Sequence, residues 1–180
     1  FASSLLADLG ADVINIENPK GGDGMRQWPP LNISKQGKEE IYSENFASVN
    51  RNKRSMTLNI KDPSDVGLLK KLVSKATILI ENYRPGVLNK LGLGYDDLKR
   101  INKKLIYCSI SGYGQSGPYS DKGAFDVTVQ AVAGIMSVTG EKDSSPVKCG
   151  VPIGDFCTGL YASYTIMAML RRIEKSGEGT

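Results

Sequence analysis

The sequence of 180 residues contains no histidine. Imidazole is the usual general base near neutral pH and the commonest metal ligand, so Ser-His-Asp and Cys-His catalysis are excluded within this chain. The three cysteines, Cys108, Cys149 and Cys157, are odd in number and form no C-x-x-C pair, which argues against a disulfide framework and against a zinc site. We therefore expect no metal ion, and a reducing intracellular compartment.

The printed residues open on no secretory-leader pattern and contain no long apolar run. The longest apolar stretch, 156–170, is interrupted by Thr158, Ser163 and Thr165 and is shorter than the ~20 residues that cross a bilayer. Phe1 lies within an amphipathic helical pattern, so we expect a fragment whose true N-terminus is missing. We expect a soluble intracellular protein without a membrane partner, in the mitochondrial matrix if eukaryotic and otherwise in the cytoplasm.

Positive charge is concentrated in the middle of the sequence. Residues 51–110 hold 13 basic and 5 acidic residues, a band that could meet a nucleic acid or a phosphorylated cofactor. Most of these cations fall on expected helix surfaces, where a solvated face is the simpler interpretation. Only the run 51–54 (RNKR), in an expected loop, favours a binding interpretation. We expect no nucleic-acid partner.

Short apolar segments alternate with helical patterns along the chain. This alternation predicts an α/β fold with a doubly wound parallel sheet. A polar excursion over 18–50, with at most a short helix near 43–49, contains the glycosylation-type triplet Asn32-Ile33-Ser34, which we interpret as a plain surface loop. We predict strands at 11–16, 55–60, 77–81 and 105–110, and helices at 1–9, 63–75, 95–101, 125–138 and 155–174. Asp62 is the expected N-cap of the second helix, and Pro63 is its expected first residue.

Two of these predictions concern burial. The strands at 77–81 and 105–110 are continuously apolar, which is typical of strands covered on both faces. The helix at 155–174 is apolar nearly all round as far as Leu170, so it should be central in the fold.

A glycine-rich segment, 112–117, matches the G-x-G-x-x-G pattern of dinucleotide-binding proteins. That pattern needs a helix to begin at once, so that free N–H groups hold the pyrophosphate, whereas Pro118 and the polar residues after it continue a loop. We therefore set aside an NAD-binding module. A loop after a parallel strand is still where open α/β sheets bind ligands.

Two aspartates begin the last two predicted helices. Asp155 lies in the first turn of the most apolar helix, where free N–H groups and the helix dipole favour an ionised carboxylate. Such a carboxylate can attack an activated carbonyl to form an anhydride. The simpler interpretation is that Asp155, and likewise Asp126, only caps its own helix.

Five ordered motifs resemble the class III CoA-transferase family, which also includes formyl-CoA transferase, carnitine CoA-transferase and α-methylacyl-CoA racemase. The similarity spans the whole chain, and the five together are far more specific than any one. The motifs are LADLGADVI at 6–14, NRNKRS at 50–55, ENYRPG at 81–86, GYGQSGP at 112–118 and GDFCTG at 154–159.

The resemblance implies that residues 1–180 are the N-terminal part of a Rossmann-like large domain, with the small domain missing, and that two full-length chains interlock as a homodimer. It also implies that Asp155 is the nucleophile that attacks an acyl-CoA thioester. Coenzyme A is then a substrate, and no cofactor is permanently bound.

The same matching implies which residues contact the substrates. Asp126 falls where related enzymes carry an acidic residue near the nucleophile. CoA would be held by Leu58, Lys61, Asn82, Tyr83, Lys90 and Lys122.

Segments 55–61 and 105–118 look most similar to the glutarate-activating branch of the family. This similarity implies transfer of CoA from an acyl-CoA, succinyl-CoA, to a small carboxylic acid, a dicarboxylate such as glutarate. Two alternatives stay open: a catalytically inactive remnant that binds CoA or forms a dimer, and an acyl-CoA racemase. The racemase branch pairs a histidine with the aspartate, and this chain has no histidine, which speaks against it.

Overall fold

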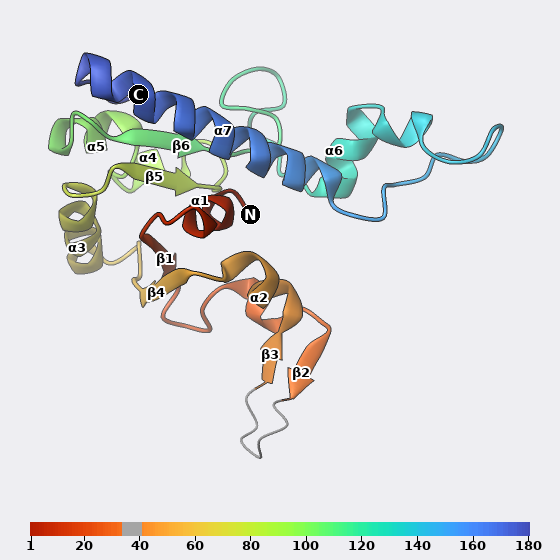
Figure 1. The fold of residues 1–180 in the computed structure, drawn as a ribbon, viewed down its shortest axis with the longest axis horizontal. Coiled ribbons are helices and arrows are strands. Elements are labelled where there is room, and N and C mark those ends of the chain that lie inside the picture. The colour runs from red at the N-terminus through yellow and green to blue at the C-terminus, as the bar shows by residue number, and fades with distance from the viewer. Residues whose placement is uncertain (34–40) are drawn as a thin grey trace. The chain divides into compact units, whose positions relative to one another are not determined.

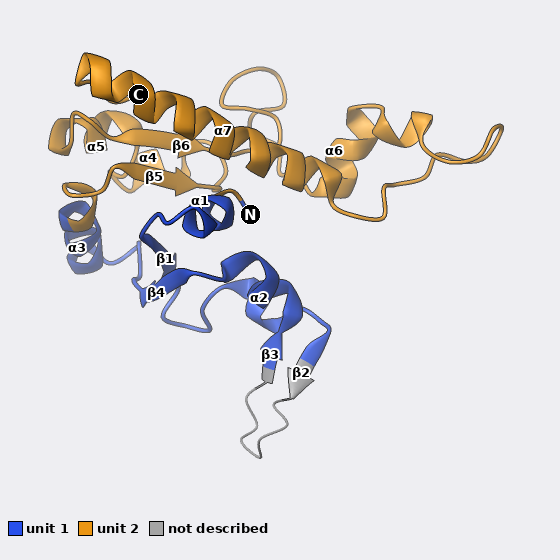
Figure 2. Cartoon of the chain, viewed as in Figure 1, with its two compact units in different colours: residues 1, 3–71 blue, residues 2, 72–180 orange. Residues whose placement is uncertain are grey.

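The computed structural model describes residues 1–33 and 41–180, which form two compact units (Figures 1 and 2). Unit 1 comprises residues 1 and 3–71, and unit 2 comprises residues 2 and 72–180. Ser34 of the glycosylation-type triplet lies outside the described residues. In chain order the elements are α1 (Ala2–Asp8), β1 (Val13–Glu17), the 3₁₀ helix η1 (Gly24–Gln27), β2 (Leu31–Ile33), β3 (Ile41–Ser43), α2 (Glu44–Asn50), β4 (Lys53–Thr57), α3 (Pro63–Val73), β5 (Ile78–Glu81), α4 (Val87–Lys90), α5 (Tyr95–Ile101), β6 (Ile106–Ser109), α6 (Asp126–Val132), the 3₁₀ helix η2 (Ile135–Val138) and α7 (Ile153–Ser176).

Both units contain a parallel strand pair, so the fold is mixed α/β. In unit 1, β1 pairs with β4 in parallel, from Val13 opposite Lys53 to Glu17 opposite Thr57. In unit 2, β5 pairs in parallel with β6. Strand β4 begins and ends earlier than the predicted 55–60, because its pairing with β1 ends at Thr57 and the chain then turns into α3.

The excursion between β1 and β4 contains more regular structure than predicted. Strands β2 and β3 pair antiparallel, and the helices η1 and α2 precede and follow them in the chain; Figure 1 shows α2 next to this strand pair. Each helix starts at a side-chain cap: Asp23 accepts from the Met25 N–H at 2.8 Å, and Ser43 from the Phe46 N–H at 3.3 Å. The prediction of at most one short helix is therefore wrong, because local capping organises this polar segment.

The basic run 51–54 is neutralised within unit 1. Arg51 forms an ion pair with Asp8, and Arg54 binds Asp12 through two hydrogen bonds of 2.9 and 2.6 Å. Lys53 is half-buried and donates to a neighbouring asparagine at 2.9 Å, and burial lowers the pKa of its ammonium. The arginines therefore bind carboxylates of this chain, and the binding interpretation of this run loses its support.

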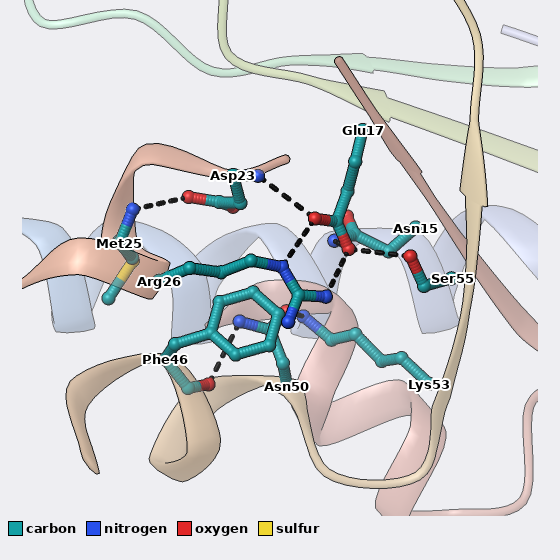
Figure 3. A network of polar contacts seen from close by, with 9 residues as sticks. All are labelled: Asn15, Glu17, Asp23, Met25, Arg26, Phe46, Asn50, Lys53 and Ser55. Carbon is teal, nitrogen blue, oxygen red and sulfur yellow. Dashed lines mark hydrogen bonds and ion pairs between the residues drawn. The ribbon is translucent and has the colours of Figure 1, made fainter. Parts of the chain in front are cut away.

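A buried carboxylate connects the excursion to the strands of unit 1 (Figure 3). Glu17 is 5% exposed and accepts hydrogen bonds from Arg26 at 2.7 and 2.8 Å, from the Ser55 hydroxyl at 2.7 Å and from the Asp23 N–H at 2.9 Å. The Arg26 guanidinium also lies 3.9 Å from the ring centre of Phe46 on α2. Led by the Arg26 hydrogen bond, these donors lower the pKa of Glu17 to about 2.

The core of unit 2 lies around β5 and β6. Helices α4 and α5 connect the two strands, and α5 has the predicted bounds. The best-buried side chains of the unit include Leu93, Leu98, Leu105 and Ile166. The residues of β5 are only half-buried, as are all but the first of β6. Because residues that point to opposite faces are buried to a similar extent, both faces of these strands are covered in part, as predicted, but neither face is covered fully.

The last two predicted helices also differ from expectation. The helix predicted at 125–138 is broken at Gly134, whose φ of 78° starts η2. Helix α7 buries Gly159, Ser163 and Ile166, whereas its opposite side exposes large side chains such as Tyr161 at 70%. The prediction that this helix is central is not met among the described residues, which cover one stripe of α7 and leave apolar side chains outside that stripe exposed. Among the described residues, no helix is long and apolar enough to cross a membrane.

Candidate active site

Asp155 lies in the first turn of α7, as predicted. The helix begins at Ile153, and the N-cap position is held by Pro152, which makes no side-chain cap hydrogen bond. Asp155 is therefore the third residue of the helix, and the simpler interpretation of Asp155 as an N-cap is wrong. Its side chain is accessible, and no described residue donates a hydrogen bond to its carboxyl oxygens.

Asp126 supplies the cap that Pro152 cannot. Its Oδ1 accepts the Gly154 N–H at 2.8 Å and the Asp155 N–H at 3.2 Å. The start of its own helix is closed instead by Thr128, whose Oγ1 accepts the Phe125 N–H at 2.9 Å. The interpretation of Asp126 as the cap of its own helix is therefore wrong: Asp126 caps α7 and lies beside Asp155.

The electrostatic environment of Asp155 works against its charged form. Partial burial raises the pKa of its carboxyl, and the nearby Asp126 carboxylate raises it further. This increase in the pKa is opposite to the effect of a helix N-terminus, which favours the ionised form and lowers the pKa. A more basic, partly desolvated carboxylate that still ionises is a stronger nucleophile than one in open water.

A cavity of about 430 Å³ lies in unit 2 at the ends of β5 and β6. Its lining includes Glu81, Arg84 and Tyr107, together with residues of α4 and α5. Asp155 is not among the described residues that line it. The carboxyl of Asp155 is thus reachable from solvent but stands apart from this cavity.

Two of the residues expected at CoA belong to unit 1, and both follow β4. Leu58 comes directly after the strand and is 5% exposed, and its N–H donates to the Glu17 carbonyl at 3.0 Å. Lys61 is exposed. Both therefore lie beyond the carboxyl end of a parallel strand, the end at which α/β folds bind ligands.

The other four residues expected at CoA belong to unit 2. Asn82 and Tyr83 directly follow β5, and the Asn82 amide donates to the Ile110 carbonyl at 2.7 Å, which joins the ends of β5 and β6. Tyr83 is 46% exposed, and desolvation raises the pKa of its hydroxyl. Lys90 is the last residue of α4, and the Lys122 ammonium lies 4.3 Å from the ring centre of Tyr119.

The glycine-rich segment is a loop, as predicted. Within the described range 110–125 no helix follows it, and the next one, α6, begins at Asp126. Gly112 has a packing role, because a Cβ placed there would lie 2.1 Å from the Cβ of Ala124. Close approach of two loop segments, rather than phosphate binding, accounts for this glycine.

Gln130 was not predicted as a site residue. It is fully buried on α6, and its Nε2 donates to Asp126 Oδ2 at 2.6 Å. The available sequence signal was a polar residue four positions after Asp126, a spacing that places both on one helix face.

Among the described residues, no group of three or more Cys, Asp or Glu side chains is arranged to bind a metal ion.

Comparison with known proteins identifies relatives along the entire chain. It is 44% identical over 179 residues to a succinate–glutarate CoA-transferase of Agrobacterium fabrum, covering 99% of this chain and 45% of that protein. It is 46% identical to the human succinyl-CoA:glutarate CoA-transferase, covering 99% of this chain and 40% of that protein. The chain thus spans less than half the length of these relatives.

A solved structure agrees with these matches. A CaiB/BaiF family protein from Brucella suis superimposes with a TM-score of 0.93 at 40% identity, covering 99% of this chain and 47% of that one. The family model for CoA-transferase family III matches residues 1–180. The chain that places Asp155 beside Asp126 at the start of α7 therefore belongs to CoA-transferase family III.

Proposed function

We propose that the protein transfers CoA from succinyl-CoA to a small dicarboxylic acid such as glutarate, with Asp155 as nucleophile. The observation that carries this proposal is the accessible Asp155 carboxyl in the first turn of α7, next to the carboxylate that caps the helix. The substrates follow from the relatives, two of which are named for succinate or succinyl-CoA and glutarate.

The proposed chemistry proceeds through two kinds of acyl–enzyme intermediate. A carboxylate oxygen of Asp155 attacks the thioester carbonyl of succinyl-CoA, the C–S bond breaks, and CoA leaves as the thiolate. The thiolate then attacks the Asp155 side of the mixed anhydride, which releases succinate and leaves an aspartyl-CoA thioester. The glutarate carboxylate attacks this thioester, which forms a second mixed anhydride and releases the CoA thiolate. The thiolate then attacks the glutaryl carbonyl of that anhydride, so glutaryl-CoA forms and the Asp155 carboxylate is restored.

No step of this cycle moves a proton. Every nucleophile is an anion, and every leaving group departs as an anion, so the reaction needs no general base. This agrees with a chain that has no histidine. Racemisation at the carbon next to a thioester requires proton removal and return, for which Asp155 and Asp126 offer only two carboxylates beside each other.

The remaining parts of the proposal concern the complete enzyme. Leu58, Lys61, Asn82, Tyr83, Lys90 and Lys122 would contact CoA, and Asp126 would lie next to the reacting acyl group. The parallel strand pairs would belong to one doubly wound, Rossmann-like sheet in the large domain. The small domain and an interlocked homodimer would complete the site. The relatives are more than twice as long as this chain, which supports a further domain.

A covalent adduct tests the function directly. The complete protein, incubated with succinyl-CoA and no acceptor, should gain the mass of a CoA thioester after loss of water, and peptide mapping should place it on Asp155. An adduct at another residue would refute the role of Asp155. CoA binding without any adduct or turnover would support the inactive, CoA-binding alternative.

Charge removal tests the proposed CoA contacts. Lys61→Ala or Lys90→Ala should raise the KM for succinyl-CoA about three- to tenfold and leave kcat within about twofold, because each ammonium would attract a phosphate without touching the reacting atoms. The effect should shrink in about 0.5 M salt. Lys75→Ala, at an exposed lysine, is the matched control, and an equal rise in its KM would contradict the assignment.

A further inference from the structure

The start of α7 depends on a side chain from another helix. The first N–H groups of a helix need acceptors outside the helix, and Pro152 at the N-cap provides none from its side chain. Asp126 Oδ1 accepts two of these groups, from Gly154 and Asp155. The backbone of Asp155 is thus held by a carboxylate of α6.

Gln130 fixes the orientation of that carboxylate. Its Nε2 donates to Asp126 Oδ2 at 2.6 Å, while its Oε1 accepts the Cys149 N–H at 2.8 Å. A backbone N–H can only donate, so the amide of Gln130 must turn its oxygen to Cys149 and its NH₂ to Asp126. Residue 126 must then accept hydrogen bonds at both of its side-chain oxygens, which a carboxylate does and an asparagine amide does not.

Gly154 provides the space for this contact. A Cβ at position 154 would lie 3.0 Å from Asp126 Oδ1, closer than side-chain atoms ordinarily approach. The absence of a side chain therefore allows the carboxylate to reach the N–H groups of both Gly154 and Asp155. Gln130 itself is fully buried, so an unmade hydrogen bond at its amide could not be replaced by bulk water.

We propose that Gln130 is a positioning residue for CoA transfer: it holds Asp126 in the orientation that caps α7, and so fixes the backbone and the carboxyl direction of Asp155. This inference rests on the proposed role of Asp155 as nucleophile. Because Asp126 does the capping, the carboxyl of Asp155 is not used as a cap and remains available to the thioester.

Gln130→Met in the complete protein tests the inference. Methionine has a similar volume but cannot bridge Cys149 and Asp126, so the kcat for CoA transfer should fall about 10- to 100-fold, the order expected when a reacting group is misplaced by about an ångström. The KM for succinyl-CoA should change less than about threefold. Amide hydrogen exchange at Gly154 and Asp155 should accelerate, which reports loss of the cap without relying on activity.

Thr128→Val is the matched control on the same helix. It removes the hydrogen bonds that close the start of α6, in which Thr128 Oγ1 accepts the Phe125 N–H and donates to the Phe125 carbonyl at 2.7 Å. It leaves Gln130 and Asp126 in place. Its kcat should stay within about twofold of wild type even if the protein is less stable. An equal loss of kcat in both variants would reduce Gln130 to a structural residue.

Gln130→Glu should make kcat depend on pH in a way that a role in packing alone would not produce. A protonated glutamic acid can donate to Asp126 and accept from Cys149, whereas an ionised one repels Asp126. Among the described residues, the ionisable ones that its contacts bring close are Asp126 on its own helix, Cys149, whose N–H residue 130 accepts, and Asp155, whose N–H Asp126 accepts. Lys148 precedes Cys149, and its ammonium donates to the Cys149 carbonyl. The ratio of variant to wild-type kcat should therefore fall as the pH rises from about 6 to about 8.

The outcomes separate this inference from the proposed function. Wild-type turnover in Asp155→Asn would refute the function itself. An inactive Asp155→Asn, together with a Gln130→Met kcat within about twofold of wild type, would refute only the positioning role. If Gln130→Met does not fold, the Gln130→Glu ratio decides: a fall with rising pH supports the role, and a constant ratio refutes it.

Discussion

Replacing Asp155 with asparagine is expected to lower the kcat for CoA transfer at least about 10³-fold in the complete protein. The amide keeps the size of the side chain but is uncharged and is a far weaker nucleophile toward a thioester carbonyl. Neither the anhydride nor the aspartyl thioester can then form. The measurement is the rate at which glutaryl-CoA appears from succinyl-CoA and glutarate, separated by chromatography, with the covalent adduct followed in parallel.

The matched control is Asp143→Asn, the same chemical change on an exposed loop. Asp143 has a φ of 61°, a left-handed conformation that asparagine adopts as readily as aspartate. Its kcat should stay within about twofold of wild type. If Asp155→Asn kept wild-type turnover while folding normally, covalent catalysis by Asp155 would be ruled out.

The elements that local sequence determines were predicted best. Helix α5 has the predicted bounds, with two acidic residues in its first turn and two basic residues in its last. Helix α3 begins at Pro63, as predicted, after Asp62, whose side chain accepts the Ser64 N–H at 2.8 Å. Charges suited to the helix dipole and a capping side chain are readable in the sequence because they act within one turn.

The features that depend on tertiary contacts were predicted less well. Asp126 opens a helix and looks like its cap, yet its partners are the N–H groups of residues 154 and 155, 28 and 29 positions away. The break at Gly134 was missed because a glycine within a helical pattern need not adopt a positive φ. The exposure of Tyr161 could not be inferred from hydrophobicity, since an apolar pattern does not tell which neighbours cover a helix.

The candidate site divides in the same way. Asp155 was found from its place at a helix start together with a family resemblance, and the structure confirms the place. Gln130 was overlooked because a single glutamine has no chemical signature, and its meaning depends on the Cys149 N–H that it accepts. A buried amide whose NH₂ donates one hydrogen bond and whose oxygen accepts another is recognisable only once its partners are known.

Glu17→Gln is expected to cause the largest loss of stability, lowering the free energy of unfolding by about 2–3 kcal/mol at neutral pH. Glutamine has the same shape, but its NH₂ group would face donors from Arg26, Ser55 or Asp23, which leaves a buried donor unpaired. Urea unfolding measures the change. The control is Glu174→Gln, which breaks an exposed ion pair with Arg171 of 2.6 Å and should change stability by less than about 0.5 kcal/mol.

The pH dependence of this difference identifies the carboxylate as its cause. The pKa of Glu17 is about 2 in the folded protein, below its ordinary value of 4.5, so the unfolded chain takes up a proton at Glu17 before the folded protein does. The stabilisation is therefore complete above about pH 5 and declines as the pH falls through 4.5 toward 2. Wild type should lose its advantage over Glu17→Gln across that range. A difference between the two proteins that stayed constant from neutral pH to about pH 3 would mean that packing, rather than the ionised carboxylate, gives Glu17 its effect.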